Sequence, residues 1–130
     1  MAEQTSKKKL ILLAEDELTL AKMYQTKFSM EGFEVEHAED GNKALQILES
    51  KTPDIILLDI IMPNLDGFGV LKKLKSDKRW SNIPIILLTN LGQESDVKRG
   101  LELGADDYLI KAHFTPQEVA DKIKKMLTEK

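Results

Sequence analysis

The feature that most constrains the fold of this sequence is a run of four aliphatic residues, 55–58, that ends in a single carboxylate, Asp59. The run lacks the alternation of apolar and polar residues that marks a strand with one exposed face. Such runs are typical of parallel strands that helices cover on both faces. The sequence therefore predicts a buried parallel strand with Asp59 at its carboxyl end, which in open α/β sheets is the edge where ligands bind.

Two more aliphatic runs of strand length occur at residues 10–14 and 83–88. The stretch 33–38 alternates apolar and polar residues, as an edge strand does, and 107–110 is a short fifth strand. Apolar residues at helical spacing separate these stretches. Strict alternation of strands and helices predicts a three-layer α/β fold with a doubly wound, five-stranded parallel sheet. Placing the aliphatic strands at the centre favours the strand order 2-1-3-4-5.

Several residues are expected to serve the fold rather than a site. Asp66 can cap a helix, and Thr115-Pro116-Gln117-Glu118 has the pattern of a capping box. The histidines, His37 and His113, have no partners at metal-ligand spacing and are predicted to lie at the surface or in loops. The methionines are predicted to fill the core or turns: Met23, Met30, Met62 and Met126.

Length and composition limit the classes of protein that this chain can represent. Its 130 residues suit one domain, 1–130, with residues 1–7 expected to form a disordered tail. With 22 acidic and 19 basic residues, it lacks the basic footprint of a direct nucleic-acid binder. The absence of cysteine excludes disulfides and thiolate metal sites. No apolar run is long enough for a membrane span or a signal peptide, so we expect a cytoplasmic protein without membrane contact.

Polar side chains follow the strands and should meet at the same edge of a parallel sheet. They provide three carboxylates, a hydroxyl and an amine: Glu15, Asp16, Asp59, Thr89 and Lys111. Three neighbouring carboxylates repel one another unless a cation lies among them. Mg²⁺ prefers a few carboxylates together with water and phosphate oxygens, and Mn²⁺ is a second candidate. The amine and the hydroxyl suit the oxygens of a transferred phosphoryl group.

Over essentially its whole length, the sequence resembles a response-regulator receiver domain of two-component signalling, as in stand-alone chemotaxis regulators. The matching motifs occur in order: Glu15-Asp16, the segment 59–67, Thr89, and Tyr108-Leu109-Ile110-Lys111. Asp40-Gly41 and the segment 104–108 are also similar. The resemblance implies the flavodoxin-like receiver fold.

The resemblance implies that Asp59 is the nucleophile and phosphoacceptor, taking a phosphoryl group from a histidine kinase or phosphotransfer protein. It implies that Asp16, Asp59 and the backbone carbonyl of Ile61 ligate Mg²⁺, with Glu15 reaching the ion directly or through water. The domain would catalyse only its own phosphorylation and slow dephosphorylation, and would be no enzyme in the usual sense.

Further implied roles concern phosphoryl binding and the switch. Thr89 and Lys111 would each bond a phosphoryl oxygen. Movement of Thr89 and Tyr108 would shift a two-state equilibrium on the face made by the fourth helix, fifth strand and fifth helix. The output partner is then another protein that the sequence does not identify, and the domain is expected to be a monomer or a phosphorylation-dependent dimer.

The chain departs from the commonest receiver pattern at three places. Glu15 stands where aspartate is usual. Lys111 precedes Ala112 rather than proline, and because a cis bond to a non-proline residue costs about 2.5–4 kcal/mol, we predict a trans peptide. Ile61 and Leu91, two residues beyond Asp59 and Thr89, are apolar and cannot orient an attacking water, so we expect slow self-dephosphorylation.

Three alternative functions remain open from the sequence. A flavin or nucleotide binder of the same architecture needs a phosphate cradle after the first strand, where the acidic residues 15–17 would repel phosphate. An aspartyl-phosphate phosphatase needs a second acid at the position of Ile61. A degenerate receiver that acts as an unphosphorylated interaction module is kept open by Ala112. No effector follows Lys130, so the chain is interpreted as a stand-alone receiver or a fragment of a longer regulator.

Overall fold

The structure is a computed structural model that describes residues 8–128. Five parallel strands form one sheet in the order β2-β1-β3-β4-β5, which confirms the predicted topology. The strands are β1 (Leu10–Ala14), β2 (Glu34–Ala38), β3 (Ile55–Leu58), β4 (Ile85–Thr89) and β5 (Asp107–Ile110). The helices are α1 (Leu18–Met30), α2 (Gly41–Leu48), α3 (Gly67–Ser76), α4 (Glu94–Glu102) and α5 (Pro116–Thr128). The predicted tail, residues 1–7, lies outside the described residues.

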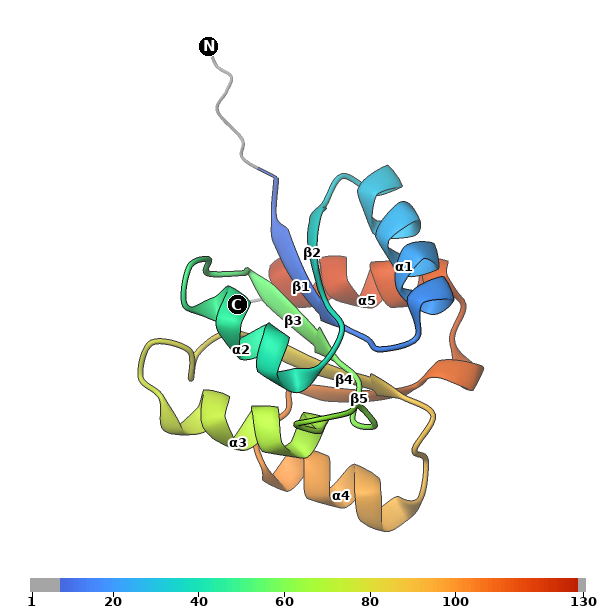
Figure 1. The fold of residues 1–130 in the computed structure, drawn as a ribbon. Helices are drawn as coiled ribbons and strands as arrows, with labels where there is room; N and C mark the ends of the chain where they lie inside the picture. The colour runs from blue at the N-terminus through green and yellow to red at the C-terminus, as the bar shows by residue number, and fades with distance from the viewer. Residues whose placement is uncertain (1–7, 129–130) are drawn as a thin grey trace.

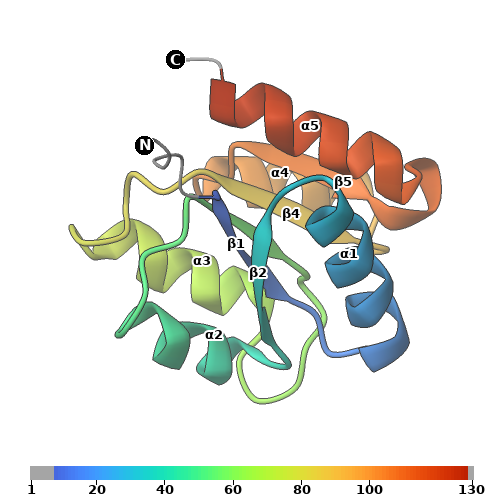
Figure 2. The ribbon, with the colours of Figure 1, turned by 90° about the horizontal axis from the view of Figure 1, so that it is seen from above.

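Helices cover both faces of the sheet, and β2 lies at one edge as its polar pattern predicts (Figures 1 and 2). Helices α1 and α5 pack together on one face, whereas α2, α3 and α4 cover the other. This is the three-layer arrangement expected from alternating strands and helices.

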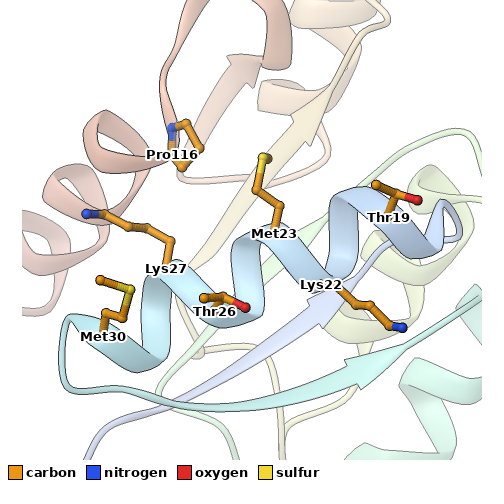
Figure 3. A pocket seen from close by; sticks show the side chains of 7 residues that line it. All are labelled: Thr19, Lys22, Met23, Thr26, Lys27, Met30 and Pro116. Atoms are coloured by element: carbon orange, nitrogen blue, oxygen red, sulfur yellow. The ribbon is translucent and has the colours of Figure 1, made fainter.

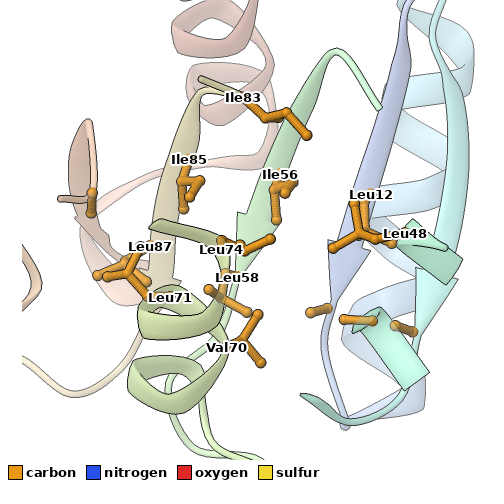
Figure 4. Packing of buried hydrophobic residues seen from close by; sticks show 14 of the residues in the cluster. Leu12, Leu48, Ile56, Leu58, Val70, Leu71, Leu74, Ile83, Ile85 and Leu87 are labelled. Carbon is orange, nitrogen blue, oxygen red and sulfur yellow. The ribbon is translucent and has the colours of Figure 1, made fainter. Parts of the chain in front are cut away.

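The two apolar layers of the core contain alternate residues of the same strands. In β3, Ile56 and Leu58 lie in the layer with Leu71 of α3 (Figure 4), while Ile55 and Leu57 belong to the layer with α1 and α5. All four strand residues are completely buried. The run is uninterrupted because both of its faces meet helices.

The predicted helix caps are confirmed. The Asp66 carboxylate accepts a hydrogen bond of 2.9 Å from the Gly69 amide, at the start of α3. Before α5, the Thr115 amide donates to the Glu118 carboxylate (2.8 Å) and the Glu118 amide donates to the Thr115 hydroxyl (3.1 Å), which is a complete capping box. These caps fix where α3 and α5 begin.

Of two expectations about structural residues, one holds in part and one is wrong. His37 lies in the predicted edge strand β2 and is half-buried rather than fully at the surface. Met23 and Met30 are 40% and 74% exposed on α1 and fill neither the core nor a turn. The spacing of apolar residues predicts a helix between β1 and β2, but it does not specify how much of that helix the sheet covers. Among residues 8–128, no helix is both long and apolar enough to cross a membrane.

Candidate phosphoacceptor site

The polar residues that follow the strands lie together at the carboxyl edge of the sheet. Ala14 is opposite Leu58 in the β1–β3 pairing, so Glu15 and Asp59 leave the sheet side by side. Thr89 is opposite Ile110 in the β4–β5 pairing, which brings Lys111 next to the same edge. These residues surround a hollow of about 240 Å³ lined by Glu15, Asp16, Glu17, Leu20, Asp59, Ile61, Thr89, Asn90 and Lys111.

Three carboxylates meet in this hollow. One oxygen from each of Glu15, Asp16 and Asp59 lies within 4.8 Å of the others. Glu15 and Asp59 are buried, whereas Asp16 is exposed at the mouth. Burial raises the pKa of Glu15, although hydrogen bonds from Lys111 and from the Glu17 amide partly oppose this rise. The cluster thus has two sheltered carboxylates and one that solvent reaches.

The Lys111 ammonium connects two of these carboxylates. Its Nζ lies 2.5 Å from Glu15 Oε1 and 2.8 Å from Asp59 Oδ2. Burial alone would lower the pKa of Lys111, but the hydrogen bonds to Asp59 and Glu15 outweigh burial and raise the pKa. Lys111 is therefore a cation that is held against Asp59.

The backbone that follows β5 has the predicted trans geometry. All peptide bonds within residues 8–128 are trans, including Lys111–Ala112. A short 3₁₀ helix, Lys111–His113, begins there and was not predicted. Lys111 therefore reaches Asp59 although no proline follows it.

Thr89 and Tyr108 both connect to the loop after β4. Thr89 is completely buried, and its hydroxyl accepts a hydrogen bond of 3.3 Å from the Leu91 amide. The Tyr108 hydroxyl donates to the Leu91 carbonyl. Burial, together with the nearby Asp96 and Asp59 carboxylates, raises the pKa of Tyr108 to about 12. The phenol therefore keeps its proton and remains a hydrogen-bond donor across the physiological pH range.

A family model, described as the response regulator receiver domain, matches residues 11–124. This chain belongs to that family. It is thus a receiver domain of two-component signalling, a family that binds Mg²⁺ in an acidic pocket and interacts with histidine kinases or other phosphodonors.

Relatives in sequence and structure agree with this assignment. The chain is 45% identical to "Probable transcriptional regulator ycf27" of Cyanophora paradoxa over 92% of its own length and 48% of the relative. It is 41% identical to the alkaline phosphatase synthesis transcriptional regulatory protein PhoP of Bacillus subtilis, over 92% and 48%. The chain thus spans about half the length of these curated relatives.

Two solved receiver domains have the same fold. The receiver domain of Francisella response regulator 1452 is similar with a TM-score of 0.84 and 34% identity, over 92% of this chain and 96% of that one. A CheY-like receiver domain protein from Methanospirillum hungatei has a TM-score of 0.86 and 26% identity, over 93% and 94%. These similarities confirm the receiver fold.

Two apolar side chains of this receiver domain lie close to the polar site. Ile61 lines the hollow with its side chain 60% exposed, and its amide lies 3.3 Å from Asp59 Oδ1. Leu91 is half-buried in the loop that Thr89 and Tyr108 contact. Neither side chain offers a hydrogen-bonding group to a water molecule beside Asp59.

Sequence reasoning missed three residues that support the site. His37 Nε2 donates a hydrogen bond of 2.6 Å to the carbonyl of Glu15, since a carbonyl can only accept. Asn64 Nδ2 donates to Asp40 Oδ2 over 2.7 Å. Gly100 of α4 faces the Tyr108 ring, and a Cβ there would lie 3.0 Å from the ring atom Cδ2. Asn64 lies within the motif segment 59–67 and Asp40 within the Asp40-Gly41 motif, but nothing in the sequence indicates that the two side chains meet.

A second hollow, of about 450 Å³, lies on the outer face of α1 (Figure 3). Met23, Met30 and Pro116 provide its apolar walls, and lysines stand at its rim. None of its lining residues belongs to the acidic hollow. Its lining residues include no carboxylate and no histidine, so it offers a contact surface rather than a second acidic site.

Proposed function

We propose that this receiver domain accepts a phosphoryl group on Asp59 from the phosphohistidine of a histidine kinase or phosphotransfer protein. The observation that carries the proposal is the placement of Asp59 at the edge of a hollow with the Lys111 ammonium 2.8 Å from its Oδ2. A fixed cation beside a carboxylate nucleophile is placed to stabilise the charge of a transferred phosphoryl group.

In the proposed transfer, an Asp59 carboxylate oxygen attacks phosphorus and forms a new O–P bond. The P–N bond to the donor histidine breaks, its electron pair returns to the imidazole, and the product is an acyl phosphate. Lys111 and the Thr89 hydroxyl would then each bond a phosphoryl oxygen. For this, the Thr89 hydroxyl would turn from the Leu91 amide, which it contacts over 3.3 Å, toward the phosphoryl group.

The donor set of the hollow fits a hard divalent cation. Asp16, Asp59 and the backbone carbonyl of Ile61 would hold Mg²⁺ or Mn²⁺, and Glu15 would contact the ion directly or through water. When bound, the ion neutralises carboxylate and phosphoryl charge. The fit rests on three carboxylate oxygens within 4.8 Å of one another, only one of which is exposed. Asp16 provides this exposed oxygen and would be the first carboxylate that an entering ion meets.

The apolar neighbours of Asp59 support slow self-dephosphorylation. Hydrolysis needs a water molecule aligned with the acyl phosphate, and positioning supplies much of the rate. The side chains of Ile61 and Leu91 cannot hold such a water. Ile61→Asn should therefore speed decay of the phosphorylated protein, and an unchanged decay rate would contradict the explanation.

We propose that Thr89 and Tyr108 transmit the phosphorylation state to the α4–β5–α5 face. Both contact Leu91 at the start of the β4–α4 loop, so movement of Thr89 toward a phosphoryl group would disturb the hydrogen bond that Tyr108 makes. The shift would bias two arrangements of this face.

The output of this switch is proposed to be contact with another protein, by a monomer or a phosphorylation-dependent dimer, without direct binding of nucleic acid by the receiver itself. The ycf27 and PhoP relatives are named as transcriptional regulators, and each is about twice as long as this chain. A fragment of such a regulator and a stand-alone receiver both fit the described residues.

The apolar face of α1 is proposed as the docking surface for the phosphodonor protein. Leu20, near the start of α1, lines the acidic hollow, and its i+3 neighbour on the helix surface, Met23, is 40% exposed. Met23 and Met30 continue along the outer side of α1 away from the site (Figure 3). Met23→Lys should slow phosphotransfer from a phosphohistidine protein but leave phosphorylation by a small acyl phosphate unchanged. Equal slowing with both donors would contradict docking at this face.

Intact-protein mass spectrometry after incubation with Mg²⁺ and a small acyl-phosphate donor tests the function. We expect one phosphoryl adduct, lost with a chelator and absent in Asp59→Asn. No adduct in any condition would favour the degenerate interaction module. An adduct that survives Asp59→Asn would place the acceptor elsewhere.

A further inference from the structure

We propose that the turn between β2 and α2 holds the loop after β3 in place. Asp40 of this turn is a positioning residue for that loop, which carries a proposed metal ligand. The inference rests on the proposed function, because it concerns the loop whose Ile61 carbonyl is a proposed Mg²⁺ ligand. Neither Asp40 nor its partner Asn64 lines the acidic hollow.

The loop after β3 forms an arch with a closed base. The Gly67 amide donates to the Ile60 carbonyl over 2.8 Å, so the chain leaves and returns at nearly the same point. Ile61 lies on the first limb of this arch and Asn64 near its tip. Without further contacts, an arch closed only at its base could tilt and carry the Ile61 carbonyl with it.

Two contacts from the β2–α2 turn hold the tip. The Asn64 side chain donates to the Asp40 carboxylate over 2.7 Å, and Asn64 has a φ of 70°, a left-handed conformation that asparagine tolerates. Next to Asp40, the backbone of Gly41 is packed so closely that a Cβ would lie 2.1 Å from the Leu65 carbonyl oxygen. The arch is therefore packed against the start of α2 and hydrogen-bonded to the residue that caps this helix.

Asp40 can do this because its carboxylate has two oxygens with different partners. Oδ1 accepts the Lys43 amide over 2.8 Å and caps α2, while Oδ2 holds Asn64. These hydrogen bonds, first that from Lys43 and then that from Asn64, hold the pKa of Asp40 below its usual value. The residue is thus an anion at neutral pH and forms a charge-assisted bond to the arch.

The last residues of β2, directly before this turn, support the loop after β1. His37 Nε2 donates to the Glu15 carbonyl over 2.6 Å, and the Glu15 amide donates to the Ala38 carbonyl over 2.9 Å. One short segment, residues 37–41, thus contacts both loops that carry proposed metal ligands. Residues that fix ligands from outside a metal site commonly change metal affinity when they are replaced.

Two single variants remove the hydrogen bond between Asn64 and Asp40 in different ways. Asn64→Gly removes the side chain but keeps a residue that adopts positive φ without strain. Asp40→Ser keeps a capping hydroxyl for α2 but is too short to hold Asn64 as well. We expect each to weaken Mg²⁺ binding roughly tenfold in an NMR titration with magnesium chloride. A protein with both substitutions should bind Mg²⁺ no more weakly than the single variant with the lower Mg²⁺ affinity. This is expected because both changes remove the same hydrogen bond.

A charge-conserving swap provides the rescue. In Asp40→Asn combined with Asn64→Asp, Asn at 40 can still cap Lys43 with its oxygen and donate its amide to Asp at 64. We expect this protein to recover Mg²⁺ affinity to within about twofold of the original, on the reasoning that the partners of a broken contact are coupled. Thr115→Ala, which removes the cap of α5 far from the arch, should lower the melting temperature without changing Mg²⁺ affinity.

The outcomes separate the inference from the function on which it rests. If the unaltered protein binds Mg²⁺ and Asn64→Gly and Asp40→Ser bind it equally well, the positioning role is wrong and the proposed function stands. If Thr115→Ala weakens binding as much as the arch variants, general destabilisation explains the effect and the inference is overturned. If the unaltered protein neither binds Mg²⁺ nor becomes phosphorylated, the proposed function itself fails.

Discussion

Replacing Gly67 with alanine tests how closely α3 is packed onto the strand end that carries Asp59. Gly67 is the first residue of α3, and a Cβ there would lie 2.3 Å from the Asp59 carbonyl oxygen and 2.6 Å from Ile60 Cα. Both neighbours are backbone atoms, which no rotamer change can move aside. To reach the 3.0 Å below which real Cβ contacts essentially do not occur, the helix and the strand end must separate by about 0.7 Å.

Two opposing effects determine the sign of the change in stability. Alanine is favoured over glycine in a helix by roughly 0.5–1 kcal/mol. Overpacking in a well-packed region typically costs about 1–3 kcal/mol. Because Gly67 meets backbone, we expect the upper part of that range and a net loss of about 2 kcal/mol. The shift would also displace Asp59, so phosphorylation by a small acyl phosphate should slow.

Gly69→Ala is the matched control, because Gly69 lies in the same first turn of α3. Its added Cβ would lie 2.6 Å from Leu65 Cδ1, the end of a half-buried side chain that can rotate away. Helix propensity should then offset the contact, giving a change within about 0.5 kcal/mol of zero.

Urea unfolding followed by the fluorescence of Trp80, which is buried in the core, measures both variants. The two variants are predicted to differ by about 2 kcal/mol in free energy of unfolding. For a domain of this size, this corresponds to a difference of roughly 6–10 °C in melting temperature. If Gly67→Ala is as stable as Gly69→Ala, or more stable than the unaltered protein, the close packing of α3 on the strand end is refuted.

Three further predictions concern other parts of the domain. Gly100→Ala would place a Cβ 2.6 Å from Leu87 Cδ1 and 3.0 Å from Tyr108 Cδ2, so both side chains should move away from α4. Burial is the main cause of the raised Tyr108 pKa, so NMR titration should show the phenol pKa falling from about 12 toward its ordinary value of 10.0; an unmoved pKa would contradict the contact. Hydrogen bonds from lysines, Lys124 first, lower the pKa of Glu31, so its contribution to stability is present above the ordinary value of 4.5 and lost as the pH falls through the lowered pKa. E31Q should therefore lose more stability in urea at pH 7 than at pH 3, and an equal loss at both would refute the ion pairing. Leu71→Ala empties a completely buried position and should cost roughly 2–5 kcal/mol in urea unfolding; a loss below 1 kcal/mol would show that the core can collapse there.

The fold was predictable because the amino-acid composition of each strand reflects how much of that strand is buried. Residues 55–58 and 85–88 are aliphatic at every position since helices cover both faces, and β2 is more polar since it lies at an edge. Strict alternation then limits the topology to a few arrangements, because crossovers between parallel strands are right-handed. The positions of Asp59 and Lys111 followed from the same logic, as the first residues after two parallel strands.

Features that depend on which side chain faces which element could not be predicted. His37 was expected at the surface because nothing in its neighbourhood shows that the Glu15 carbonyl lies within 2.6 Å. Met23 and Met30 have helical spacing, but their exposure depends on how much of α1 the sheet and α5 cover. In both cases the deciding partner is distant in sequence, and periodicity carries no information about it.

Two departures from the usual receiver pattern, Ala112 and Glu15, both affect where the Lys111 side chain points. Ala112 removes the proline that commonly follows this lysine, and the peptide between them is trans. Nevertheless, Lys111 Nζ lies 2.8 Å from Asp59, and its other contact is Glu15, over 2.5 Å. Glu15 has one more methylene group than the usual aspartate, and the Glu17 amide and the strand pairing of its own backbone hold it in place. The glutamate thus gives the amine a second anchor on the far side of the hollow, so side-chain hydrogen bonds direct Lys111 toward Asp59 without a cis peptide.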